Sequence, residues 1–339
     1  LKNMQFLTGN TFDVQYANEN FLEHVKPTVK MIVLACNTAT AYALQDVRNY
    51  LEQQQKNIPV IGVIDAGAKA ALQYQQKQQG TIGVFATAGT VASEGYPNTL
   101  KAFAAKMNMK QPEVVSQGGV GLAESIDRDW SYYSDTLTAV RTAYKGPSIK
   151  NKQLPLDTLL LGAYHFNKKG NELLCETDGT GNCLDMQLNE PANYARYHLV
   201  TLLEKMRRQP YAKPLNTLIL GCTHYPYLKD TIASVLHELY DYKVDGNYVY
   251  RNVLSQQVEL IDPSVETAKE AYIILRAKNL QQKKNNQGSN DFFISIPNTT
   301  LPETQLQADG WFTYAYKYGR AAGANKKYVE YVPFNTHNV

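Results

Sequence analysis

Apolar runs of strand length alternate with helical segments along the first third of the chain. The runs 31–35, 58–64 and 81–85 are rich in Val, Ile, Leu and Phe, and each is followed by a segment of helical composition, of which 41–51 is the first. Strands that alternate with helices in this way are typical of α/β proteins with a mostly parallel sheet. Ligands bind such sheets at the carboxyl ends of the strands.

The second half of the chain continues the pattern with more interruptions. Apolar runs predict three further strands, at 157–161, 215–220 and 258–262. The segment 263–277, after the last of them, predicts a helix. Between the first two strands, the polar and glycine-containing segment 167–190 indicates an inserted hairpin or loop. The polar segment 281–290 predicts a linker, and the aromatic-rich end 291–339 contains a strand-like FFISI.

Composition excludes several classes of protein. The chain has 339 residues, enough for two domains, with 44% hydrophobic and 19% charged residues and a net charge of only +3. Lys and Arg are scattered rather than interleaved with aromatics, so we expect no nucleic-acid partner. No apolar run approaches the ~20 residues that span a bilayer, and no signal peptide is present, so we expect no membrane partner and a cytoplasmic location. Because residue 1 is Leu, we also expect an upstream segment.

The cysteines are few and widely spaced. They are Cys36, Cys175, Cys183 and Cys222. None forms a CxxC pair, which argues against zinc-ribbon and thioredoxin-like sites. Cys175 and Cys183 flank a turn-rich segment, so they form either a disulfide, if the protein is exported, or two free thiols. Asp178 and Asn182 in that segment do not complete a calcium ligand set, and we predict no metal site.

Two apolar strands about one domain apart end in similar ways. MIVLACNTAT at 31–40 and TLILGCTHYP at 217–226 each place a cysteine before hydroxyl or amide residues. This repeat predicts two similar lobes that face each other. We expect lobe A to contain 1–79 and 228–339, and lobe B to contain 80–227 with an insertion around 140–213.

The two cysteines suit proton transfer at a carbon atom. A thiol between a strand and a helix N-terminus lies near backbone N–H groups that stabilise a thiolate and lower its pKa. The same N–H groups can bind a carboxylate. Inversion of an α-carbon removes a proton from one face and delivers another to the opposite face, which Cys36 and Cys222 could do as a pair. His224 could serve Cys222 as a base, although a histidine at a strand end can also be purely structural.

ACNTAT at 35–40 and GCTHYP at 221–226 resemble the two signature motifs of glutamate racemases, in the cofactor-independent aspartate/glutamate racemase superfamily. Segments 58–72, 82–96 and 260–268 are also similar to that family. The resemblance implies two pseudo-symmetric flavodoxin-like lobes with mostly parallel sheets and an active site in the cleft between them. It further implies conversion of L-glutamate to D-glutamate for peptidoglycan, no metal, pyridoxal phosphate or nucleotide cofactor, and a homodimer.

The resemblance also assigns roles to residues at matching positions. Cys36 and Cys222 correspond to the two catalytic acid/bases. The residues that correspond to substrate-binding or catalysis-supporting positions are Asn37, Thr38, Thr90, Thr223 and His224. Glu124, in the GLAES segment, matches a carboxylate that orients the histidine; the alternative is a surface glutamate.

One departure from the family pattern leaves alternatives open. Racemases of this family begin with a strand ending in Asp-Ser-Gly, followed later by a Tyr-Gly pair, and this sequence contains neither upstream of Cys36. The alternatives are a racemase of aspartate or another amino acid, and a degenerate relative that only binds an acidic ligand. A cysteine hydrolase is a further alternative, but it would leave the second cysteine without a role.

Overall fold

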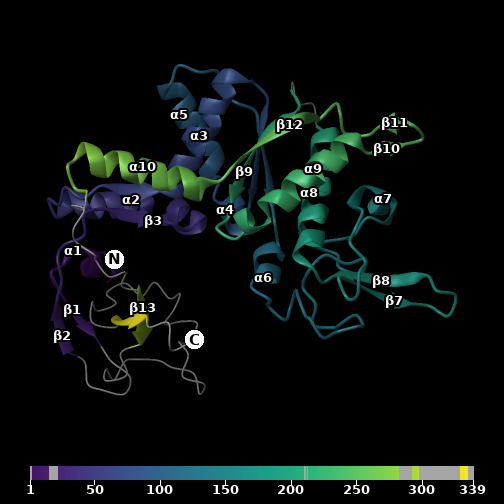
Figure 1. Ribbon diagram of the computed structural model, residues 1–339, viewed down its shortest axis with the longest axis horizontal. Helices are drawn as coiled ribbons and strands as arrows, with labels where there is room; N and C mark the ends of the chain where they lie inside the picture. Colours follow the sequence, from purple (N-terminus) through teal and green to yellow (C-terminus); the bar gives the residue numbers. More distant parts are fainter. Residues whose placement is uncertain are drawn as a thin grey trace. The chain divides into compact units, whose positions relative to one another are not determined.

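The computed structural model describes residues 2–14, 22–209, 211, 213–281, 292–297 and 329–334 (Figure 1). Contacts divide the chain into two compact units. The first comprises Leu1–Ile32, Asp46–Pro59 and Ile274–Val339, and the second comprises Val33–Gln45 and Val60–Ile273. All predicted site residues belong to the second unit, so the fold of that unit positions the candidate site.

A four-stranded parallel sheet forms the centre of the second unit. Its order is β12 (Leu254–Ile261), β9 (Leu215–Gly221), β5 (Thr81–Ala86) and β6 (Val114–Gly118). Every residue of β5 and β9 is buried. Parallel strands covered on both faces are near-continuous apolar runs, which is the pattern these two strands show in the sequence. The predicted α/β class with a parallel sheet is confirmed.

Alternate side chains of the central strands enter two separate cores. Leu218 and Leu220 of β9 pack into a cluster with α8 (Pro191–Arg207) and α9 (Lys229–Asp241), while Ile219 packs into a cluster with α3 (Val63–Lys77) and α5 (Gly95–Lys106). This alternation follows from the two-residue period of a strand. The helices therefore cover both faces of the sheet (Figure 1).

The first cysteine lies after a short strand that pairs with another. β3 (Ile32–Leu34) and β4 (Val60–Gly62) form a two-stranded sheet, and α2 (Asn37–Gln53) follows β3. The predicted strand 58–64 ends early, because α3 begins at Val63. A Cβ atom on Gly62 would lie 2.5 Å from Thr40 and 2.9 Å from Leu44, so glycine permits the close approach of α2.

The predicted strand at 157–161 is wrong. These residues form a 3₁₀ helix, η1 (Thr158–Leu160), followed by α7 (Leu161–Tyr164). The Asp157 carboxylate accepts a 3.0 Å hydrogen bond from the backbone N–H of Leu159, which is a helix N-cap. Leu159 is 91% exposed, so this apolar run does not enter the core as a buried strand would.

A disulfide-linked hairpin occupies the predicted insertion. β7 (Leu173–Thr177) and β8 (Cys183–Leu188) pair antiparallel, which confirms the hairpin expected in 167–190. Of the two alternatives for Cys175 and Cys183, the structure contains the disulfide. In the turn, Asp178 accepts hydrogen bonds from Thr180 and Asn182, which lower the pKa of Asp178 to about 2.

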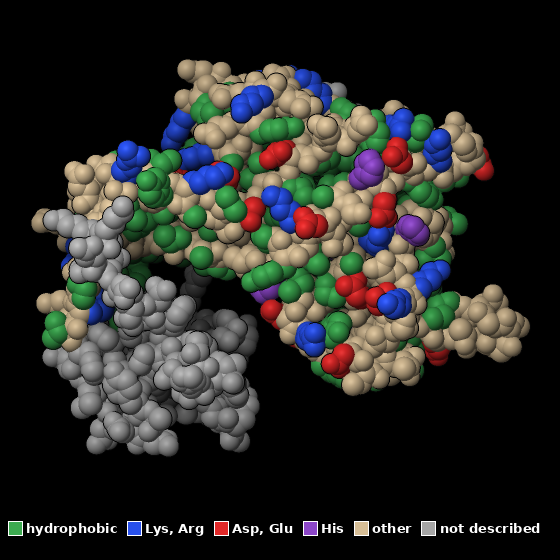
Figure 2. Space-filling view, in the orientation of Figure 1, with side chains coloured by type: hydrophobic (Ala, Val, Ile, Leu, Met, Phe, Trp, Pro, Cys, Tyr) green, Lys and Arg blue, Asp and Glu red, His purple; other side chains and the backbone are tan. Residues whose placement is uncertain are grey.

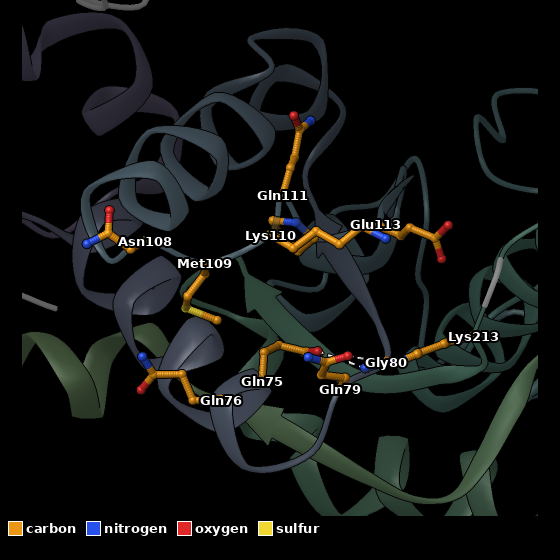
Figure 3. A pocket seen from close by; sticks show the side chains of 11 residues that line it. Gln75, Gln76, Gln79, Gly80, Asn108, Met109, Lys110, Gln111, Glu113 and Lys213 are labelled. Carbon is orange, nitrogen blue, oxygen red and sulfur yellow. Dashed lines mark hydrogen bonds between the residues drawn. The ribbon is translucent and has the colours of Figure 1, made fainter.

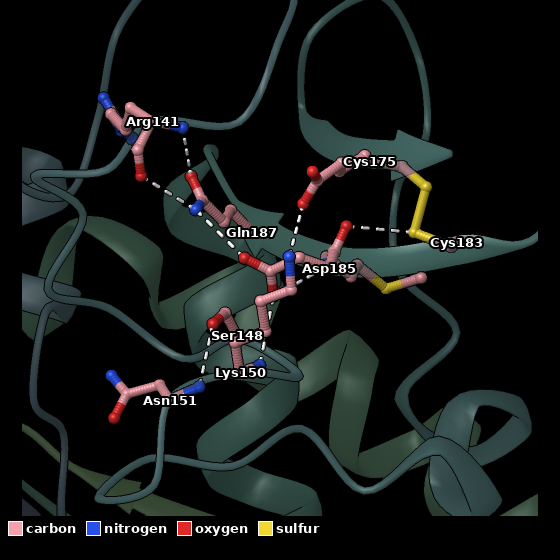
Figure 4. A network of polar contacts seen from close by, with 10 residues as sticks. Arg141, Ser148, Lys150, Asn151, Cys175, Cys183, Asp185 and Gln187 are labelled. Carbon is pink, nitrogen blue, oxygen red and sulfur yellow. Dashed lines mark hydrogen bonds and ion pairs between the residues drawn. A yellow bond between two sulfur atoms is a disulfide. The ribbon is translucent and has the colours of Figure 1, made fainter. Parts of the chain in front are cut away.

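Polar contacts attach the hairpin to the preceding chain (Figure 4). The backbone N–H of Arg141 donates to Gln187 Oε1, and Gln187 Nε2 donates back to the carbonyl of Arg141, both at 3.0 Å. Asp185 Oδ1 accepts a 3.1 Å hydrogen bond from the backbone N–H of Lys150. Arg141, Asp185 and Gln187 are buried, so these paired contacts satisfy polar groups that would otherwise be costly to bury.

The remaining described elements are short, apart from one helix of 15 residues. They are α1 (Lys2–Thr8), β1 (Thr11–Val14), β2 (Leu22–Val25), α4 (Ala88–Ala92), α6 (Leu122–Ile126), η2 (Tyr225–Leu228), β10 (Lys243–Val244), β11 (Asn247–Tyr248), α10 (Pro263–Ala277), β13 (Phe292–Pro297) and β14 (Val329–Phe334). β13 and β14 pair antiparallel, which confirms the strand expected at FFISI. The predicted linker 281–290, apart from residue 281, lies outside the described residues.

Basic and acidic side chains lie interspersed on the face that Figure 2 shows. Among the described residues, no helix is both long enough and apolar enough to cross a bilayer.

Candidate active site

Both free cysteines follow the carboxyl ends of strands, as the sequence predicts. Cys36 lies between β3 and α2, and the backbone N–H of Ala39 points to its sulfur at 3.5 Å. Cys222 directly follows β9 and precedes η2. Cys36 is exposed, whereas Cys222 is only 6% exposed. The two thiols therefore occupy similar places along the chain but differ strongly in their access to water.

One aromatic side chain connects the two cysteine loops. The Tyr96 hydroxyl, on α5, donates a 2.6 Å hydrogen bond to Oδ1 of Asn37, the residue after Cys36. A Cβ atom on Gly221, the residue before Cys222, would lie 3.1 Å from Cε2 of Tyr96. Tyr96 is 1% exposed. The neighbours of Cys36 and of Cys222 thus contact the same buried ring, which brings the two loops to one place in the second unit.

Three threonine hydroxyls form a second connection at this end of the sheet. Thr38 Oγ1 lies 3.0 Å from Thr90 Oγ1 and 3.3 Å from Thr87 Oγ1, and the latter two are 3.0 Å apart. Thr87 also caps α4 by accepting the backbone N–H of Thr90. Two predicted substrate-binding residues, Thr38 and Thr90, are therefore brought into direct contact.

The charges around Cys222 show which groups lie near its sulfur. Burial raises the pKa of the Cys222 thiol above its ordinary value, whereas the backbone N–H groups of His224 and Tyr225 act to lower it. Negative charge on Cys36 and on Glu124 acts to raise it further. The net direction is opposite to the lowering expected from the sequence, because burial outweighs the two hydrogen bonds. The interaction with Cys36 places the two thiols within electrostatic reach of each other.

His224 lies between a thiol and a carboxylate. Its Nδ1 is 3.5 Å from Cys222 Sγ and 3.5 Å from Thr223 Oγ1, and its Nε2 is 3.1 Å from Asp127 Oδ2. Asp127 directly follows α6. Sequence reasoning did not select Asp127 and assigned the orientation of the histidine to Glu124, one helical turn earlier. The carboxylate that the structure pairs with His224 is Asp127, while Glu124 acts on Cys222 through its charge.

This arrangement has the groups that proton transfer at the α-carbon of an acid requires. Two thiols supply an acid and a base. Backbone N–H groups at the starts of α2 and η2, with the hydroxyls of Thr38 and Thr223, are donors that suit carboxylates. Donors already in place would stabilise the negative charge that develops when the α-proton leaves.

A separate cavity lies at the other end of the strands. It has a volume of about 430 Å³ and is lined by residues from the end of α3, the segment before β6 and the residue Lys213 before β9 (Figure 3). Gln75 points into this region, but its amide is already bonded to Asn216, Thr217 and Gly80. Because ligands of parallel sheets bind at the carboxyl ends of strands, the cysteine end remains the candidate site.

The sequence of this chain is similar to the sequences of glutamate racemases. No family model matches the sequence. A glutamate racemase of Oceanobacillus iheyensis is 26% identical over 287 residues, which cover 82% of this chain and 71% of the relative. A glutamate racemase of Limosilactobacillus fermentum is 37% identical over 148 residues, which cover 42% of this chain and 47% of the relative. Depending on the relative, the matched part of this chain thus spans 47% to 71% of the curated protein.

Among solved structures, a glutamate racemase isoform from Bacillus anthracis is 24% identical, with a TM-score of 0.44. The match covers 76% of this chain and 62% of that chain.

Proposed function

Because this chain is a homologue of the glutamate racemases, we propose that it interconverts L- and D-glutamate with Cys36 and Cys222 as acid and base. The observation that carries the proposal is the contact of Tyr96 with the neighbours of both cysteines. Two thiols in one place, each after a strand end, suit a reaction that needs a proton donor and a proton acceptor at one carbon.

The proposed reaction moves one proton in each of two steps. The thiolate of one cysteine takes the α-proton, and the electron pair of the C–H bond stays on the substrate as an enolate-like anion. The thiol of the other cysteine then delivers its proton to the opposite face. The cysteines have exchanged protonation states at the end, so the reverse reaction uses the same groups in opposite roles. In this proposal Asn37, Thr38, Thr90 and Thr223 hold the substrate carboxylates and amino group.

The proposal also covers the choice of substrate, the biological role, the assembly and the division into lobes. We propose glutamate rather than aspartate as the substrate because the relatives of this chain are glutamate racemases. Supply of D-glutamate for peptidoglycan, a homodimer and independence of metal, pyridoxal phosphate and nucleotide also belong to the proposal. So does the division into lobe A (1–79 with 228–339) and lobe B (80–227).

Circular dichroism of L-glutamate in the presence of the protein tests the proposal. We expect the signal to decay towards that of the racemate with wild type and to persist with Cys36→Ala or Cys222→Ala. The double variant Cys175→Ala/Cys183→Ala is the matched control and should racemise like wild type, because its cysteines lie in the hairpin. Racemisation by either single variant at the wild-type rate would refute the proposal. Glutamate binding without racemisation would favour a degenerate, ligand-binding relative.

A further inference from the structure

Asp127, His224 and Cys222 form a continuous chain of polar contacts. Asp127 Oδ2 is 3.1 Å from Nε2 of His224. On the other side of the imidazole ring, Nδ1 of His224 is 3.5 Å from Cys222 Sγ. The His224 side chain is 32% exposed and that of Asp127 is 63% exposed. The imidazole therefore contacts the buried thiol with one nitrogen and a more exposed carboxylate with the other.

We propose that Asp127 is a positioning residue that keeps a proton on Nε2 of His224 and so leaves Nδ1 free to accept the proton of the Cys222 thiol. A carboxylate on one ring nitrogen fixes the tautomer and the ring orientation, because only a protonated nitrogen can donate to it. The role of Asp127 in racemisation rests on the proposed function. Its effect on the thiol does not, since that effect exists without substrate.

The proton step is simple to balance. The S–H bond of Cys222 breaks, its electron pair stays on sulfur, and the proton forms a bond to Nδ1. The ring then carries a positive charge between the Cys222 thiolate and the Asp127 carboxylate, and Nε2 continues to donate to Asp127. No oxidant, reductant or second substrate takes part.

Other titratable groups face Cys222 and have to be held constant. They are Cys36 before α2, Glu124 on α6, Tyr96 on α5 and Tyr225 on η2. Cys36 and Glu124 act on the pKa of Cys222 by their negative charge. Asp127 contacts His224, and His224 contacts the thiol, so the geometry routes an effect of Asp127 through the ring.

This geometry gives the Asp127→Asn substitution a definite sign. If Asp127 acted only as a nearby negative charge, its removal would make the Cys222 thiolate easier to form and lower the pKa of the thiol. If it positions His224, its removal weakens the acceptor of the thiol proton and raises that pKa. Since the ion pair is partly exposed, we expect a two- to fivefold effect, roughly 0.3–0.7 pH unit.

Alkylation kinetics measure this quantity without any racemase assay. In a Cys36→Ser background the disulfide occupies the hairpin cysteines, so Cys222 is the one thiol that iodoacetamide can modify. The rate is measured against pH by mass spectrometry of the intact protein. The midpoint of the profile reports the pKa of Cys222, whereas a change in packing alone would alter the plateau rate.

We expect Asp127→Asn to move this midpoint to higher pH and Asp127→Glu to restore it. Asp129→Asn is the matched control, because it removes the same charge from the same segment, where the Asp129 carboxylate accepts a 2.7 Å hydrogen bond from the backbone N–H of Ser131. In a His224→Ala background, Asp127→Asn should no longer move the midpoint. A midpoint that falls or stays unchanged with Asp127→Asn, or a shift that persists without His224, would overturn the inference.

Discussion

The hydroxyl of Tyr96 donates a 2.6 Å hydrogen bond to Oδ1 of Asn37, and both side chains are buried. Tyr96 also packs against Gly221, so one ring contacts the chain beside each catalytic cysteine of the proposed reaction. Burial and the negative charges of Asp262 and Cys222 raise the pKa of this phenol, which keeps it protonated and able to donate. The relationship ties the geometry of the site to the packing of α5.

Tyr96→Phe should therefore weaken both stability and activity. The substitution leaves Oδ1 of Asn37 buried without its donor, which costs about 1–3 kcal/mol. We expect a lower midpoint in urea denaturation and a lower kcat/KM for glutamate. Tyr74→Phe is the control, since the Tyr74 hydroxyl bonds Gln78 at the surface and its loss should change stability by less than about 0.5 kcal/mol. Equal stability of the two variants would contradict the prediction.

Gly221→Ala should displace the loop that carries Cys222. Its Cβ would lie 2.7 Å from Cβ of Ala86 and 3.3 Å from the backbone oxygen of Phe85, which cannot move easily within β5. We expect a loss of about 1–3 kcal/mol in the free energy of unfolding and a large loss of activity.

Gly89→Ala serves as the matched control for that substitution. Its Cβ would lie 3.6 Å from Thr38, an ordinary contact, and the residue is in helix α4. Alanine should be neutral there or stabilise the fold by about 0.5–1 kcal/mol. Thermal denaturation of both variants compares their stabilities directly. A Gly221→Ala protein as stable as wild type would contradict the close packing beside Cys222.

Glu124→Gln should shift the pKa of Cys222 in the direction opposite to Asp127→Asn. The negative charge of Glu124 acts to raise this pKa, so a neutral amide makes the thiolate easier to form. The alkylation midpoint of Cys222 should fall by roughly 0.3–0.7 pH unit, and the acidic limb of kcat/KM should move to lower pH with it. A rise would mean that Glu124 stabilises the thiolate through His224, as the resemblance to the racemases implies.

The hairpin disulfide should stabilise the protein without affecting the chemistry. Replacing both Cys175 and Cys183 by Ser removes a short covalent loop, which the chain-entropy model values at about 2–3 kcal/mol. We expect a lower melting temperature and unchanged racemisation. Mass spectrometry of the unreduced protein checks the bond itself, and alkylation of all four cysteines without a reductant would contradict it.

The sequence predicted the central strands well because their environment is uniform. β5 and β9 are buried on both faces, so their composition alone identifies them. Reading an apolar run as a buried strand failed at 157–161, where Leu159 is exposed. There the Asp157 side chain caps a helical turn instead. An apolar run of that length does not distinguish a strand from a short helix.

The candidate site could be predicted only where a motif carries it. Cys36 and Cys222 were found because each follows a strand within a recognisable motif. Asp127 and Tyr96 were not singled out, because their contacts with His224 and Asn37 arise from tertiary packing between segments far apart in the sequence. No local spacing identifies such partners.

Incorporation of deuterium at the α-carbon tests the two-thiol mechanism most directly. With L-glutamate in D₂O, wild type should form D-glutamate whose α-hydrogen comes from the solvent, because the proton removed by one thiol is not the one delivered by the other. Cys36→Ser and Cys222→Ser should each slow this conversion by about 10²–10⁴-fold, the usual contribution of a general acid or base. Conversion without solvent deuterium, or at the wild-type rate in either variant, would contradict the account.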